Sequence, residues 1–234
     1  MGAGVQPREC KTLKIVLLES PLETVPRELW SHPQVRRTAA RYGIEPGEML
    51  LDKTLHYHAM ATLPQKWKRG RPDIVHTTLL LLQDSLLNLE GRLRIYVHVY
   101  DDRVFAVEPE TRIPKHYERF RGLMAQLLRE NRVPPDGKPL IYLEAESLRD
   151  YVRRHGKIIL LWEHGQDATP AQAARLALAT SRPLGIGMFP RGDFRKQTLR
   201  KTWLRLRLAA GRPLKAWTVA SMIVNAAEQL LGIL

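Results

Sequence analysis

The chain has 234 residues, of which 44% are hydrophobic and 26% are charged, and these fractions exclude a largely disordered protein. Its 37 Lys and Arg residues outnumber its 24 Asp and Glu residues, giving a net charge of +13, and this excess favours a polyanionic partner. Cys10 is the single cysteine, which excludes a disulfide framework and a cysteine zinc site and favours a reducing cytoplasm.

Apolar runs in the sequence are short. None approaches the roughly 20 residues that a transmembrane helix needs, and the first residues lack the apolar core of a signal peptide. We therefore expect no membrane partner and a cytoplasmic location.

The first part of the chain predicts strands and helices with clear local signals. After the first apolar run, residues 20–46 are polar and interrupted by prolines. Pro72 and Asp73 suit the first turn of a helix, and residues 92–100 alternate apolar and polar side chains as a strand does. The predicted elements are a strand at 14–19, a helix at 72–83, a hairpin at 92–100 and 103–108, and a helix at 114–132.

The second part of the chain alternates strand and helix patterns. It follows the turn cluster Val133–Pro139, which we interpret as a boundary between two lobes. The predicted strands are 140–144, 158–162, 184–189 and 202–208, and the predicted helices are 147–155, 170–180 and 215–231. This alternation predicts an α/β fold with a mostly parallel sheet.

Several standard sites are disfavoured by the residues present. GIGMFPRG (residues 185–192) begins like a dinucleotide fingerprint, but Pro190 stands where the third glycine belongs. His56 and His58 would share one face of a strand, yet no third ligand is near them in the sequence, so we expect no metal site. No phosphate loop and no nucleophile elbow occurs.

Basic residues gather around two turns and the helix starts that follow them. One group comprises Lys66, Lys68, Arg69 and Arg71, and the other comprises Arg112, Lys115, Arg119 and Arg121, with Trp67, Tyr117 and Phe120 among them. Cations beside flat aromatic rings suit RNA, because phosphates need charge and unstacked bases need a stacking partner. Positive groups at a helix start also oppose the helix dipole, which favours an anion there.

Four segments resemble one protein family. KRGRPDIVHTTLLLLQDSLLN (68–88), the stretch 91–128 with ETRIPKHYERF, GMFPRG (187–192) and GRPLKAWTVASMIV (211–224) are similar to the ribosomal small-subunit pseudouridine N1-specific methyltransferases, in their archaeal style. The resemblance implies one domain over residues 1–234 with a SPOUT-type α/β fold and a C-terminal deep trefoil knot, which spacing alone does not reveal. It also implies S-adenosylmethionine as cofactor, small-subunit ribosomal RNA as partner, and a homodimer.

The resemblance also assigns residues. It implies RNA contacts at Arg71, Asp73, Arg112, Lys115 and Arg119, with Asp73 holding Arg71 in position. We interpret Asp73 as orienting Arg71 through a charge-assisted pair and not as a base. It implies cofactor contacts at Leu160, Gly187, Gly192, Ala209, Ala210, Gly211, Arg212, Pro213 and Leu214. The glycines suit that role because they let backbone approach a ligand closely.

Two alternatives to this function stay open. The protein could be a non-catalytic assembly factor that binds precursor rRNA, and other assembly factors could then be partners. It could also be a knotted methyltransferase that acts on tRNA. The last predicted helix, residues 215–231, is apolar around most of its circumference, so we expect it to be buried, and we interpret it as the dimer interface.

Overall fold

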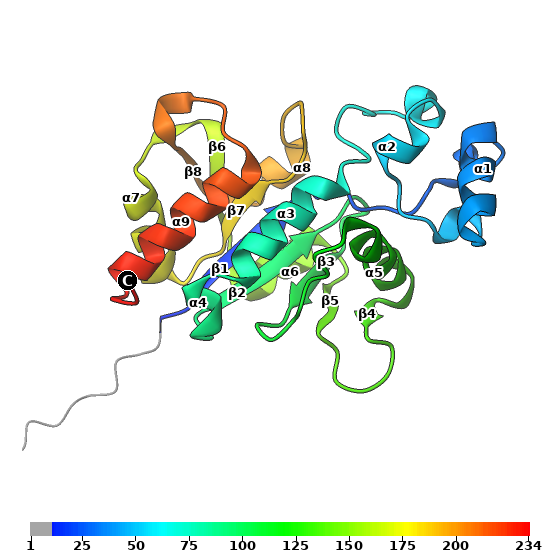
Figure 1. Ribbon diagram of the computed structural model, residues 1–234. Helices are drawn as coiled ribbons and strands as arrows, with labels where there is room; N and C mark the ends of the chain where they lie inside the picture. The colour runs from blue at the N-terminus through cyan, green and yellow to red at the C-terminus, as the bar shows by residue number, and fades with distance from the viewer. Residues whose placement is uncertain (1–10) are drawn as a thin grey trace, which may run out of the picture.

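Eight strands form one sheet within residues 11–234, the range that the computed structural model describes (Figure 1). Cys10 lies outside the described residues. The strand order is β4 (Arg132–Val133), β5 (Ile141–Ala145), β3 (Val104–Val107), β2 (Leu93–His98), β1 (Leu13–Leu18), β7 (Leu184–Gly187), β6 (Ile158–Asp167) and β8 (Thr202–Arg207). From β2 to β8 the neighbours are parallel, and β3, β5 and β4 extend the sheet antiparallel. The predicted α/β fold with a mostly parallel sheet is confirmed.

Helices cover both faces of the sheet. On one face lie α3 (Pro72–Gln83), α4 (Leu86–Leu89), α5 (Tyr117–Glu130), α7 (Pro170–Thr180) and α9 (Ala216–Leu230), and on the other lie α6 (Leu148–His155) and α8 (Lys196–Leu199). Strand β1 serves both cores, because Ile15 and Leu17 pack on the first face and Val16 and Leu18 on the second. Burial on both faces explains why β1 is a continuous apolar run and not an alternating one.

Residues 21–70, here called the insert, separate β1 from α3 and lie at one end of the molecule (Figure 1). The insert contains α1 (Pro33–Tyr42), α2 (Lys53–His56) and the 3-10 turns η1 (Arg27–Leu29), η2 (Pro46–Glu48) and η3 (Ala59–Thr62). It has its own core, which includes Val25, Leu29, Val35, Leu51 and Met60. Two backbone hydrogen bonds close its base, from Leu51 N to Glu23 O (2.9 Å) and from Lys53 N to Gly70 O (2.8 Å).

Two sequence-based expectations about the layout are wrong. The turn Val133–Pro139 does not separate lobes, because it joins the paired strands β4 and β5 of the continuous sheet. Strand β6 runs five residues beyond the predicted end at Trp162, because a register shift lets Gln166 and Asp167 pair with β8. Within the described chain, no helix is long and apolar enough to cross a bilayer.

Candidate functional site

A cavity of about 500 Å³ lies at the end of the sheet where the parallel strands β6, β7 and β8 finish. Leu161 and Trp162 of β6, Ile186 of β7 and Leu208 after β8 contribute to its walls. The first turns of α3 and α9 complete it. In open α/β sheets the carboxyl ends of parallel strands are where ligands bind, so we call this cavity the strand-end pocket.

Three glycines form part of the wall of the strand-end pocket. Gly187, Gly192 and Gly211 all line it. Gly192 and Gly211 have φ of +91° and +78°, a left-handed conformation that side chains rarely allow. At Gly187 a Cβ atom would lie 2.8 Å from Cζ of Phe194, so a side chain cannot be added without moving the wall. A ligand here can therefore reach peptide N–H and C=O groups directly.

The cofactor residues implied by the resemblance fall into two groups. Gly187, Gly192, Gly211, Arg212, Pro213 and Leu214 line the strand-end pocket together. Leu160 does not line it, because its side chain is fully buried in the core on the α6 face, while the next residue, Leu161, does. Ala209 and Ala210 lie in the turn η4 (Ala209–Gly211), where their φ values of 53° and 51° bend the chain before the pocket-lining segment.

The residues of the strand-end pocket that the sequence analysis did not assign to the site include Trp162, Asp193 and Trp217. The indole of Trp162 donates a hydrogen bond to Asp193 Oδ1 at 2.7 Å, and this oxygen also accepts from Phe194 N at 2.7 Å. The interaction fixes the loop after β7 against β6. Trp162 and Asp193 lie 31 residues apart, so no local motif signals their contact.

Arg71 and Asp73 lie at the entrance to α3, where Arg71 lines the strand-end pocket. Arg71 Nε donates to Asp73 Oδ1 and Arg71 Nη2 to Asp73 Oδ2, both at 2.7 Å. These hydrogen bonds raise the pKa of the Arg71 guanidinium, and their planar two-bond geometry restricts its orientation. Both side chains stay partly exposed, so the guanidinium has a fixed direction and access to a ligand.

The remaining basic residues expected to contact RNA are exposed around the start of α5. Arg112 and Lys115 precede the helix, and Arg119 lies in its first turn. The aromatic residues beside them are not free stacking surfaces. Phe120 is fully buried and stacks on His76 with ring centroids 4.4 Å apart, and Tyr117 donates a hydrogen bond to Asp52 at 2.7 Å.

Two of the four basic residues in the first group are interior ion-pair partners, so their interpretation as RNA contacts is wrong. Lys68 and Arg69 are 6% and 4% exposed. Arg69 makes a two-bond pair with Glu23 at 2.6 and 2.8 Å, and burial of this carboxylate raises its pKa. Of the aromatic residues in the two groups, Trp67 is the exposed one at 52%.

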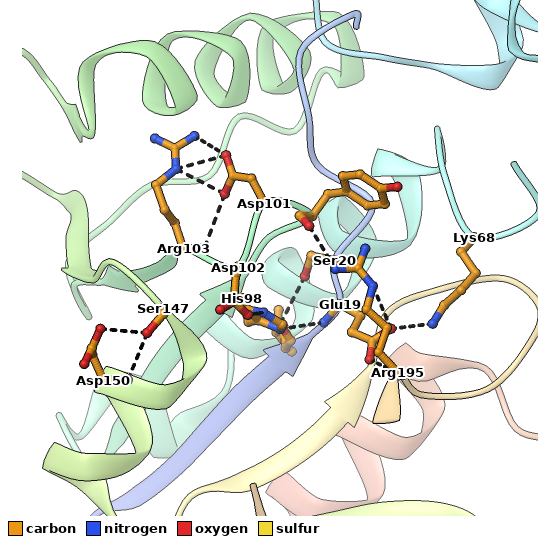
Figure 2. Close-up of polar contacts among 12 residues, drawn as sticks. Glu19, Ser20, Lys68, His98, Asp101, Asp102, Arg103, Ser147, Asp150 and Arg195 are labelled. Atoms are coloured by element: carbon orange, nitrogen blue, oxygen red, sulfur yellow. Dashed lines mark hydrogen bonds and ion pairs between the residues drawn. The ribbon is translucent and has the colours of Figure 1, made fainter. Parts of the chain in front are cut away.

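Glu19 is the centre of a buried polar network at the end of β1 (Figure 2). Its carboxylate pairs with Lys68 and accepts a hydrogen bond from Arg195 N at 2.7 Å. Lys68 Nζ also donates to Asp193 O at 2.6 Å and lies 3.9 Å from the ring centroid of Phe189. The network therefore ties β1 and the insert to the loop that lines the strand-end pocket.

The backbone of Glu19 is held in an unfavourable conformation. Its φ of 49° is in the left-handed region, which a residue with a side chain adopts only when its surroundings enforce it. Glu19 N donates to Nδ1 of buried His98 at 3.1 Å, and His98 Nε2 lies 3.0 Å from Asp102 Oδ1 (Figure 2). These hydrogen bonds hold the Glu19 carboxylate next to residues 193–195, which follow β7.

His56 and His58 do not form a metal site together. They lie at the end of α2 and just after it, not on a strand. His56 is fully buried and His58 is exposed. Across residues 11–234, no three His, Cys, Asp or Glu side chains are grouped so that they could hold a metal ion.

The fold and the strand-end pocket define an α/β protein with a small-molecule site at the carboxyl ends of its parallel strands, and Arg71 in the wall of that site is suited to an anionic second ligand. The sequence profile of the EMG1/NEP1 methyltransferases matches residues 15–228. The chain belongs to this family.

Known proteins of similar sequence and structure agree with this assignment. A ribosomal RNA small subunit methyltransferase Nep1 from Aeropyrum pernix is 57% identical over 93% of this chain and 98% of its own length. The protein of the same name from Staphylothermus marinus is 46% identical over 95% and 97%. The crystal structure of Archaeoglobus fulgidus Nep1 bound to S-adenosylhomocysteine matches with a TM-score of 0.84 and 34% identity, covering 95% of this chain and 99% of that one.

Proposed function

We propose that this protein transfers a methyl group from S-adenosylmethionine to N1 of a pseudouridine in small-subunit ribosomal RNA, and so takes part in biogenesis of that subunit in the cytoplasm. The observation that carries the proposal is the strand-end pocket with Arg71 in its wall. A site that can hold the methyl donor thus adjoins Arg71, an oriented cation that can bind a phosphate.

The residues of the strand-end pocket suit this cofactor. A volume of about 500 Å³ is within the range of small-molecule sites, and the glycines expose the backbone groups that a nucleoside-like ligand can bind. Helix α9 begins at the pocket with no side-chain cap on its N-terminus, so its free N–H groups suit a carboxylate. When S-adenosylmethionine is bound in this pocket, its sulfonium group supplies a methyl group that is already activated.

The residues of this chain contribute mainly alignment, since bringing N1 in line with the methyl group supplies much of the rate. Arg71 is positioned to hold a phosphate beside the target nucleotide. Both carboxylate oxygens of Asp73 are engaged by Arg71, so Asp73 serves as a positioning residue, and the proton of N1 leaves to another acceptor. The proposal includes the C-terminal trefoil knot that the resemblance implies.

Mass spectrometry of RNA tests this function directly. Small-subunit rRNA that contains pseudouridine, the same transcript with uridine, and tRNA are each incubated with the protein and isotope-labelled S-adenosylmethionine. Label on N1 of pseudouridine in the rRNA is the expected result. Label in tRNA would instead support the tRNA methyltransferase, and RNA binding without any label would support the assembly factor.

Removing individual arginines is expected to weaken RNA binding through lost phosphate contacts. Arg71→Ala, Arg112→Ala and Arg119→Ala should each lower the slope of log K against log salt concentration by about one, while cofactor affinity stays close to wild type for Arg112→Ala and Arg119→Ala. Titrations at several salt concentrations measure the slope. Arg175→Ala, which removes an exposed arginine from α7, is the control; equal slopes in all four variants would contradict these contacts.

Asp73 is expected to act on RNA through Arg71. Asp73→Asn removes the charge, Arg71→Ala removes the guanidinium, and the double variant removes both. Because the two side chains form one unit, the double variant should bind RNA about as weakly as Arg71→Ala alone. RNA affinities, with melting temperatures alongside, measure the coupling. Strictly additive losses would show that Asp73 acts independently.

A homodimer through α9 is also part of the proposal. Ala220, Ile223, Val224 and Ala227 are buried within one protomer, where α9 packs on α3 and α7, so they do not require a partner. Met222, which is 37% exposed, lies on the outer face. Sedimentation at micromolar concentration should give a dimer, and Met222→Glu should shift it toward monomer with little change in melting temperature. A wild-type monomer would contradict the dimer.

A further inference from the structure

A second cavity, of about 490 Å³, lies between the insert and α5. Tyr42, Ile44, Met49 and Leu55 line it from the insert, and Arg119, Gly122 and Ala125 line it from α5. It shares no lining residue with the strand-end pocket. Its size is within the range of ligand sites, and it is called here the insert groove.

Gly122 is the unexpected residue of the insert groove. It lies in the interior of α5, where glycine destabilises a helix relative to alanine. Its φ is not positive, and a Cβ atom placed on it would meet no atom within 4 Å. Neither the backbone nor the packing of the chain therefore requires glycine. What the missing side chain does preserve is open space over the helix.

The walls of the insert groove combine an exposed aromatic ring with charged side chains of both signs, namely Arg119, Arg121, Glu48 and Glu118. Tyr42 is 37% exposed, and its hydroxyl donates to Glu118 Oε1 at 3.3 Å and accepts from Arg121 Nη2 at 3.2 Å. The guanidinium groups of Arg41 and Arg121 lie 5.7 and 5.6 Å from the centroid of its ring. A fixed aromatic ring beside cations is the arrangement on which unpaired bases stack.

The insert groove also adjoins the entrance to the strand-end pocket. The ring centroid of Tyr117, the first residue of α5, lies 5.6 Å from that of His76 in α3, the helix that begins just after Arg71. The Tyr117 hydroxyl donates to Asp52, and Leu50 and Leu55 on either side of Asp52 line the groove. The start of α5, where Arg119 is exposed, thus contacts both α3 and the segment that lines the groove.

We propose that the insert groove binds an unpaired nucleobase of the substrate RNA, a neighbour of the nucleotide that is methylated, by stacking it against Tyr42 over Gly122. This proposal rests on the proposed function, because it assumes that the substrate is RNA. The insert would then contribute to specificity for the nucleotides that flank the methylated one.

Filling the groove tests the proposal without harming the fold. Gly122→Leu places a side chain in open space and replaces glycine with a better helix former, so its melting temperature should equal or exceed that of wild type. Gln126→Leu is the matched control, since it adds the same side chain one turn later on α5, outside the groove. Melting curves of both variants verify that any change in binding is not unfolding.

The probe is a short single-stranded rRNA fragment with one pseudouridine, together with a series in which single neighbouring nucleotides lack their base. Gly122→Leu should bind the intact RNA about tenfold or more weakly than wild type, and Gln126→Leu should not. One abasic position should weaken wild type by a similar factor and weaken Gly122→Leu no further. Equal affinity of Gly122→Leu and wild type, or the same abasic penalty in both, would overturn the proposal.

The binding assay separates this proposal from the proposed function. Affinity is measured whether or not the RNA becomes methylated, so a wild-type protein that binds this RNA but leaves N1 unmodified contradicts the function alone. Normal methylation by Gly122→Leu, with the wild-type KM for RNA, contradicts only the proposal that the insert groove binds a nucleobase. Retention of RNA binding by that variant also leaves a protein partner as the alternative occupant of the groove.

Discussion

Replacing Lys68 with methionine is expected to lower the free energy of unfolding by about 3 kcal/mol, because it removes the nearer countercharge of the buried Glu19 carboxylate and leaves the Arg195 guanidinium, whose Nε is 4.0 Å away. The side chains of Lys68 and Glu19 are almost inaccessible, at 7% and 2% exposure. Lys66→Met is the control in the same segment. Lys66 is exposed, and its replacement should cost less than about 0.5 kcal/mol.

The same variant should also weaken cofactor binding. Lys68 holds the carbonyl of Asp193 and lies against Phe189, and both residues belong to the strand-end pocket. The double variant Lys68→Met with Glu19→Gln should recover part of the lost stability, because it removes both charges, but not the cofactor affinity. Urea unfolding and calorimetric titration with S-adenosylhomocysteine measure the two effects. Equal stability of the Lys68 and Lys66 variants would contradict the buried pair.

Acidification should destabilise the protein through His56. Burial, and to a smaller extent Arg121, lowers the pKa of His56 to about 4, while Asp52 opposes the shift. The unfolded chain therefore takes up this proton near pH 6.5, before the folded protein does. The resulting stability is complete above pH 6.5 and is lost as the pH falls toward 4, by about 3 kcal/mol in total.

His56→Asn isolates this contribution, since asparagine can still accept the hydrogen bond that Asp52 N donates to His56 Nδ1 at 3.2 Å. Chemical unfolding at pH 7, 6, 5 and 4 compares the two proteins, because other titrating groups are common to both. Between pH 7 and pH 4, we expect the free energy of unfolding of the variant to fall by about 3 kcal/mol less than that of wild type. Parallel curves would show that His56 does not titrate in the way its burial requires.

Helices with local signals were predictable from the sequence. Helices α3 and α7 begin and end at the predicted residues. Each has proline in its first turn, and Thr169 and Gln172 form a capping box on α7. Helix α1 was missed, although Pro33 starts it and Gly43 ends it, because only a few of its ten residues are buried and its apolar pattern is weak.

Contacts between distant segments limited what could be predicted of the site. Six predicted cofactor residues that line the strand-end pocket are in motifs that the resemblance supplied: Gly187, Gly192, Gly211, Arg212, Pro213 and Leu214. Lys68, in contrast, appeared to be one more surface cation, because its partner Glu19 is 49 residues away. The charge pattern of a sequence does not distinguish a solvated lysine from a buried one. The polar network around Glu19 could therefore be identified only from the three-dimensional structure.

The insert leaves the sheet after β1 and returns before α3 through a base closed by hydrogen bonds between Leu51 and Glu23 and between Lys53 and Gly70. Because it also has a core of its own, its outer surface can change in sequence without disturbing the strands or the pocket. If the insert groove binds a nucleobase as proposed, target preference and chemistry are encoded in separate parts of one chain. Exchange of residues 24–50 between relatives offers a direct route to methyltransferases with altered RNA preference and an intact donor site.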